Sequence, residues 1–154
     1  MKTGRIKIFY IYFLMFGVIF FQCSKKIQTK LIESEPIHKL VSLSKSSCFG
    51  KCAVYNLTIY NDGLAIFEGK ENVEKIGVYH KMLNAVEFDK VQNAVHSIKW
   101  NNYKTSYMRN IPDLPVSTLS YYNVKDSSKI AIQSNSALPP ELEELHKNMV
   151  EIAN

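Results

Sequence analysis

The chain has 154 residues, of which 46% are hydrophobic and 21% are charged. That length suits one domain, and those fractions are ordinary for a globular protein. The formal net charge of +5 includes Lys2, Arg5 and Lys7, so it falls to +2 without residues 1–22, which hold no acidic side chain. A near-neutral domain gives no electrostatic reason to expect nucleic-acid binding, because such binders carry clustered Lys and Arg side chains.

The first 22 residues have the parts of a secretory signal peptide. Three positive side chains precede an uncharged apolar run of 14 residues, from Ile8 to Phe21. A membrane-spanning helix needs about 20 apolar residues, so the shorter run favours an export signal. The rest of the chain is therefore expected outside the cytoplasm.

Cys23 follows this run almost directly, after Gln22. A cysteine in this place resembles a bacterial lipobox, in which the cysteine becomes the lipidated first residue of the mature protein. We expect cleavage before Cys23 and attachment to the membrane through its lipid, so that the protein faces the periplasm or the cell surface. Phe20 and Phe21 depart from the small residues usual before the cysteine, so an uncleaved N-terminal anchor is the alternative.

Residues 23–39 are polar and lack a sustained period, which predicts a tether. A single domain is then expected over residues 40–154. Within it, alternating apolar and polar residues predict strands over residues 41–43, 53–60, 64–67, 73–80, 116–124 and 129–133. The sequence Asn61-Asp62-Gly63 predicts a hairpin loop, because Gly63 can take a positive φ without steric cost.

Two amphipathic helices are predicted from apolar residues spaced three or four apart. The first has a stripe formed by Phe88, Val91, Val95 and Ile98. Asn84 and Glu87 have the spacing of a capping box at its start. The second follows Pro139-Pro140 and has a stripe formed by Leu142, Leu145, Met149 and Ile152. The order of elements predicts an α+β domain, an antiparallel β-sheet with the two helices packed on one face.

Several short motifs resemble a family of bacterial domains of unknown function, DUF6438. The segment Cys48-Phe49-Gly50-Lys51-Cys52 matches the family's Cys-Phe-Gly-x-Cys, although Ala53 stands where the family usually has Pro. Pro112-Asp113-Leu114-Pro115 is similar to its Thr-Asp-x-Pro, and residues 138–142 are similar to the lead into its last helix. The resemblance covers about residues 40–154. It implies a fold and a location but no activity.

Cys48 and Cys52 are the two cysteines that remain if Cys23 is lipidated, and an oxidising compartment favours a disulfide between them. Their Cα atoms would have to lie about 4.4 to 6.8 Å apart, so the segment must turn, which Gly50 allows. A redox-active pair would need features that lower a thiol pKa, such as a helix start, whereas a strand follows here. A zinc site would need two further ligands, and the histidines are scattered singly. Two free thiols are the remaining alternative.

Trp100, Tyr103 and Tyr107 follow the first predicted helix and lie near basic residues, so they form a candidate binding surface. More often, such residues close one end of the core. Asp113 is held between two prolines in a predicted loop and is a further candidate. Its simpler role is to turn the chain.

The sequence contains no phosphate-binding loop, metal-ligand set or nucleophile motif, and no cofactor or metal is predicted. We therefore expect a non-catalytic binding or structural module of the cell envelope. Its partners would be the membrane, through the lipid on Cys23, and an unidentified envelope protein or ligand. The alternative is an envelope enzyme, either of thiol-redox type through Cys48 and Cys52 or of another type.

Overall fold

A computed structural model describes residues 35–154 of the chain. The predicted signal peptide, the predicted lipidation site at Cys23 and the first part of the tether lie outside the described residues. The strands are β1 (Lys39–Lys45), β2 (Val54–Tyr60), β3 (Leu64–Glu71), β4 (Gly77–Met82), β5 (Ser106–Tyr107), β6 (Ser117–Asn123) and β7 (Ser128–Ser134). The helices are α2 (Ala85–Ser97), the short 3-10 turn η2 (Trp100–Asn102) and α3 (Pro140–Ala153). No helix within residues 35–154 is long and apolar enough to cross a membrane.

The strands form one sheet in the order β4-β3-β2-β1-β6-β7-β5. Neighbouring strands are antiparallel except for β5 and β7, where Ser106 and Tyr107 run parallel to the end of β7. The sheet is therefore mixed, and the prediction of an antiparallel sheet is wrong, whereas the α+β class holds. The error has a physical cause. A two-residue strand leaves no alternating pattern, and it joins the sheet because the Gln133 N–H donates to the Thr105 carbonyl at 2.9 Å.

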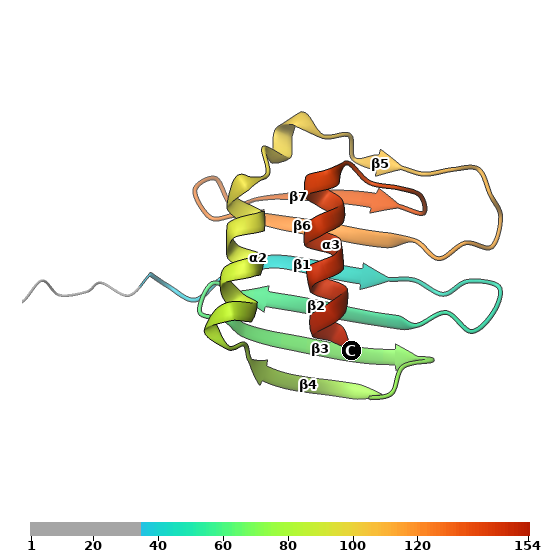
Figure 1. The fold of residues 1–154 in the computed structure, drawn as a ribbon, viewed down its shortest axis with the longest axis horizontal. Helices are drawn as coiled ribbons and strands as arrows, with labels where there is room; N and C mark the ends of the chain where they lie inside the picture. The colour runs from blue at the N-terminus through green and yellow to red at the C-terminus, as the bar shows by residue number, and fades with distance from the viewer. Residues whose placement is uncertain (1–34) are drawn as a thin grey trace, which may run out of the picture. The chain divides into compact units, whose positions relative to one another are not determined.

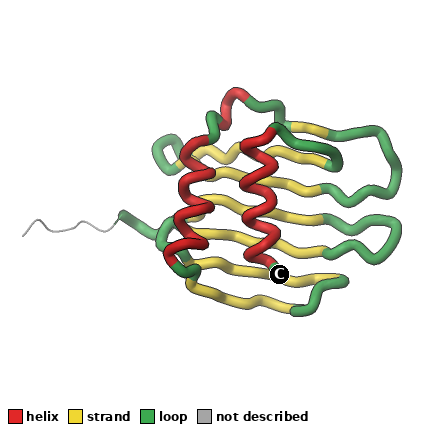
Figure 2. The backbone as a smooth tube through the Cα atoms, viewed as in Figure 1, coloured by secondary structure: helices red, strands yellow, loops and turns green. Residues whose placement is uncertain are grey.

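Both helices lie over the same face of the sheet and run across its strands (Figures 1 and 2). The strands present their alternate apolar side chains to this face. Leu43 of β1 lies between Leu57 of β2 and Leu119 of β6, and all three are buried. The helices cover this row with the buried side chains of Val91, Val95, Leu142, Leu145 and Met149. One face of the sheet thus provides the hydrophobic core of the domain.

The opposite face of the central strands is polar. Ser42 of β1 is flanked by Thr58 of β2 and Ser120 of β6. The hydroxyls of Ser42 and Tyr122 lie 3.2 Å apart. No helix within the described part of the chain covers this face (Figure 1). The alternation of apolar and polar residues that predicted the strands therefore separates the apolar face that the helices cover from an open face without a helix of residues 35–154, on which Ser42 and Ser120 are nevertheless buried.

Local signals fix the ends of several elements. The predicted capping box is present, since the Asn84 side chain accepts from the Glu87 N–H at 2.9 Å and the Glu87 carboxylate accepts from the Asn84 N–H at 3.0 Å. The pKa of Glu87 is lowered by its hydrogen bonds to Lys81 and to the Asn84 backbone. Gly63 has a φ of 85° in the predicted hairpin loop.

The fourth strand begins later than predicted, at Gly77 rather than at residue 73. Asn72 has a φ of 52° and Gly77 a φ of 107°, so the chain turns between them before it can pair with β3 again. Residues 72–76 consequently form a turn that lies at the same end of the sheet as the connection between β1 and β2 (Figure 1).

The buried row predicts a large effect of Leu43→Ala. The substitution leaves a cavity between β1 and the helices, so we expect the free energy of unfolding to fall by about 2 to 5 kcal/mol. Val86→Ala changes an exposed side chain and should alter it by less than about 0.5 kcal/mol. Chemical denaturation followed by circular dichroism measures both changes. Equal effects of the two substitutions would contradict this description of the core.

Candidate functional site

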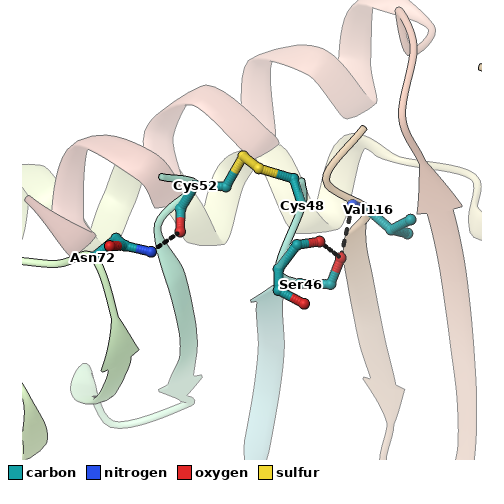
Figure 3. The surroundings of a disulfide bond; sticks show 6 residues. Ser46, Cys48, Cys52, Asn72 and Val116 are labelled. Carbon is teal, nitrogen blue, oxygen red and sulfur yellow. Dashed lines mark hydrogen bonds between the residues drawn. A yellow bond between two sulfur atoms is a disulfide. The ribbon is translucent and has the colours of Figure 1, made fainter. Parts of the chain in front are cut away.

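A disulfide bond joins Cys48 and Cys52 in the connection between β1 and β2, with the two Cα atoms 5.8 Å apart (Figure 3). Only three residues lie between the cysteines. The chain turns there because the Gly50 N–H donates to the Cys48 carbonyl at 2.9 Å. A loop this short cannot enclose a core of its own, so the side chains within it point to solvent or to neighbouring loops.

Hydrogen bonds hold this connection from both sides (Figure 3). On one side, the Asn72 side chain donates to the Cys52 carbonyl at 3.1 Å from the turn between β3 and β4. On the other side, the Ser46 N–H donates to the Val116 carbonyl at 2.9 Å, and the Val116 N–H donates to the Ser46 hydroxyl at 2.9 Å. The disulfide loop is therefore fixed in place by the loops on either side of it.

Large apolar side chains are exposed at this end of the sheet. Phe49, at the tip of the disulfide loop, is 89% exposed. Its N–H donates to the Asp113 carbonyl at 3.4 Å, which joins the disulfide loop to the loop of residues 108–116. That second loop exposes three further side chains. We name as the disulfide-end surface the four residues Phe49, Met108, Ile111 and Leu114. Exposed aromatic residues and methionines are enriched in binding interfaces.

A groove of about 350 Å³ borders this surface where α3 begins, and Leu114 also lines it. Ser117 Oγ lies 3.3 Å from Nε2 of His146. Lys45 is the cross-strand neighbour of Ser117. Burial, and then the charge of Lys45, lower the pKa of His146, whereas Glu143 acts in the opposite direction. A neutral imidazole and a hydroxyl can each donate a hydrogen bond to a polar ligand or accept one from it, and the Lys45 ammonium can donate one.

This Ser–His contact is not by itself a catalytic site. Nucleophilic catalysis also needs a group that orients the base and donors that stabilise an oxyanion. Within residues 35–154, the only hydrogen bond of the His146 ring is the one to Ser117. Nor do three or more His, Cys, Asp or Glu side chains of these residues gather where they could hold a metal ion.

Residues 39–153 match the family described as "Domain of unknown function (DUF6438)". The chain belongs to the DUF6438 family. The match runs from the start of β1 to the end of α3, so the DUF6438 domain includes the whole sheet, both helices and the disulfide loop. No curated protein matches the chain.

The aromatic residues that follow α2 in the DUF6438 domain mostly serve its core. Trp100 is only 6% exposed, and its indole N–H donates to the Val95 carbonyl at 3.1 Å. Its ring stacks on Tyr121, with the ring centroids 4.9 Å apart. Tyr103 and Tyr107 are half-buried and pack against the core. Trp100 therefore presents no surface to a ligand.

Asp113, the fourth residue of the predicted binding surface, does not lie beside Trp100. It is exposed in the loop of residues 108–116, with a φ of 68°, and its carbonyl accepts from Phe49. The loop of residues 108–116 lies at the disulfide end of the sheet, whereas the η2 turn that contains Trp100 follows the end of α2 (Figure 1). The backbone hydrogen bond from Phe49 to Asp113 places Asp113 at the disulfide end of the sheet.

In the sequence, Phe49 was identified only as part of a motif and was not predicted to be an exposed anchor. The signal was present, because a large aromatic residue within a three-residue disulfide loop has no room to be buried. The contact between Ser117 and His146 had no such signal. It joins a strand to a helix 29 positions away, and only packing brings the two together.

The disulfide should stabilise the DUF6438 domain modestly. Because the bond closes a short loop, Cys48→Ser with Cys52→Ser should lower the free energy of unfolding by about 2 kcal/mol or less. Reduction of the native protein should have the same effect, and the doubly substituted protein should not respond to reductant. Chemical denaturation with and without reductant makes the comparison. Free alkylation of both thiols in the untreated native protein would contradict the bond.

Proposed function

We propose that this protein is a non-catalytic binding module of the bacterial cell envelope, exported through residues 1–22 and anchored by a lipid on Cys23. The observation that carries the proposal is the exposure of Phe49 at the tip of the disulfide loop. Burial of a phenylalanine side chain in a partner would contribute about 1.5 to 3 kcal/mol. The occupant that suits this surface is an envelope protein with an apolar pocket for the ring.

The loop that carries Phe49 is organised before any partner arrives. The disulfide closes it, and hydrogen bonds from Asn72 and to Val116 hold it on either side. Binding therefore orders little additional backbone, which lowers the entropic cost of association. This feature favours recognition of a partner over a purely structural role.

The point at which the described chain enters the domain also supports this proposal. β1 begins at Lys39 and ends at Lys45, next to the disulfide loop, so the described chain enters the domain at the opposite end of the sheet (Figure 1). A membrane anchor attached at that end leaves Phe49 and its neighbours accessible. Ser117 and His146 in the groove beside Leu114 would supply hydrogen bonds at the edge of the same interface.

A thiol-redox enzyme is the rival function, and it is favoured by the partial exposure of both cysteines. Thiol reactivity depends on a lowered pKa, which helix starts and nearby positive groups provide. Here strand β2 follows Cys52 instead of a helix. The redox function predicts that replacing both cysteines abolishes the cellular role, while replacing Phe49 leaves it intact.

The test is cross-linking of the full-length protein in intact bacterial cells. We expect one reproducible protein partner, and we expect Phe49→Ala to reduce its capture by at least about tenfold, as loss of a central aromatic anchor does. Val124→Ala is the matched control, because Val124 is exposed in the turn between β6 and β7 at the other end of the sheet. Unchanged capture by the Phe49 variant, or recovery of no specific partner, would refute the proposal.

A further inference from the structure

Strand β4 (Gly77–Met82) is an uncovered edge of the sheet. It is the outermost strand on its side, and all six of its residues are exposed. Its most exposed large apolar side chains are Val78 and Met82, which are 60% and 61% exposed. The other outermost strand, β5, has only two residues. A long edge strand offers unpaired backbone N–H and C=O groups to another strand.

Two of the devices that usually protect an edge, a proline and a β-bulge, are missing from β4. Its sequence contains no proline, and its pairing with β3 is unbroken from Met82 to Gly77, so no bulge twists the edge away. Its one lysine, Lys81, is held by the carboxylate of Glu87 at 2.8 Å. β4 therefore remains able to pair along its whole length.

The apolar side chains of β4 belong to a larger patch on the open face of the sheet. Met82 is the cross-strand neighbour of Leu64, and His80 is the neighbour of Ile66. Val78 shares this face because strand residues two apart point to the same side. The patch thus continues from the outer edge of β4 onto β3.

We propose that β4 pairs antiparallel with β4 of a second copy, around a two-fold axis at His80. In this register, Val78 of each copy lies opposite Met82 of the other, and Tyr79 lies opposite Lys81. The two sheets become one continuous sheet, and the two patches on the open face meet across the axis. Each copy contributes the same residues, as a closed two-fold interface requires.

The side-chain pattern of β4 selects this register and this occupant. Residues that lie directly opposite each other in an antiparallel pair point to the same face of the sheet. The open-face residues of β4 have even numbers in both copies, so each must lie opposite another even-numbered residue. The two-fold axis therefore passes through a residue and not between two residues. An axis at His80 matches apolar with apolar side chains, whereas an axis at Tyr79 sets Val78 against His80. The strand is self-complementary around His80, which argues for a second copy rather than an unrelated strand.

Self-association through β4 is independent of the proposed function. β4 lies at a lateral edge of the sheet, whereas the disulfide loop that carries Phe49 connects β1 and β2 at the end of the strands (Figure 1). Because the two-fold axis reverses one copy, the two disulfide loops lie at opposite ends of the joined sheet. Both loops remain free, so loss of the dimer should leave partner capture through Phe49 intact.

The test is thiol cross-linking of full-length His80→Cys in the membranes of a bacterial host, read on a non-reducing gel. We expect a linked dimer for this variant and about tenfold less of it when Val78→Lys or Met82→Lys is added, because each sets a lysine charge against an apolar side chain of the other copy. Tyr79→Cys should link weakly, because the register sets each Tyr79 opposite Lys81 of the other copy and not opposite its Tyr79. Lys129→Cys on β7 and the unsubstituted chain should give no dimer.

Circular dichroism checks that each variant is folded. A folded His80→Cys protein that stays monomeric while its thiol reacts with a small maleimide would overturn the proposal. Equal linking of the Lys129→Cys variant would overturn it too, because that result reflects random collision. Linking to a different protein in place of a second copy would likewise refute the self-pairing.

Discussion

Coverage of one face of a seven-stranded sheet by two helices is the constraint on which the rest of this structure depends. Leu43, Leu57 and Leu119 form a row across the central strands, and the helices exclude water from it. α3 has 14 residues and is therefore about 21 Å long, whereas the outermost of seven strands lie about 29 Å apart. Helices that run across the strands cannot reach both edges, so β4 is left exposed.

The same limit applies along the strands. The connections at the disulfide end extend past the helices, so they lack a hydrophobic core to fix them (Figures 1 and 2). The disulfide and the hydrogen bonds from Asn72 and to Val116 take over that role. A short, covalently closed loop then holds Phe49 in solvent. The loop is therefore ordered although its side chains are not buried. An ordered loop with an exposed aromatic side chain is the physical basis for regarding this end as a binding surface.

Local chemistry made much of the fold predictable from the sequence. The capping box of Asn84 and Glu87 and the hairpin loop at Gly63 depend on a few neighbouring residues, and both are present. The two-residue strand β5 could not be predicted, because its parallel pairing depends on where β7 lies. The burial of Trp100 could not be predicted either, since an aromatic residue after a helix can close a core or form a surface. Phe49 was predictable in principle from the size of its loop.

The most direct test of the account is hydroxyl-radical footprinting of the full-length protein in intact cell envelopes and after purification in detergent. A binding surface at the disulfide end predicts that Phe49 and Met108 are oxidised much less in envelopes than in the purified protein. Tyr60, next to the hairpin loop at the other end of the strands, should be oxidised equally in both. Equal oxidation of Phe49 in the two samples would contradict the claim that this surface is occupied by a partner.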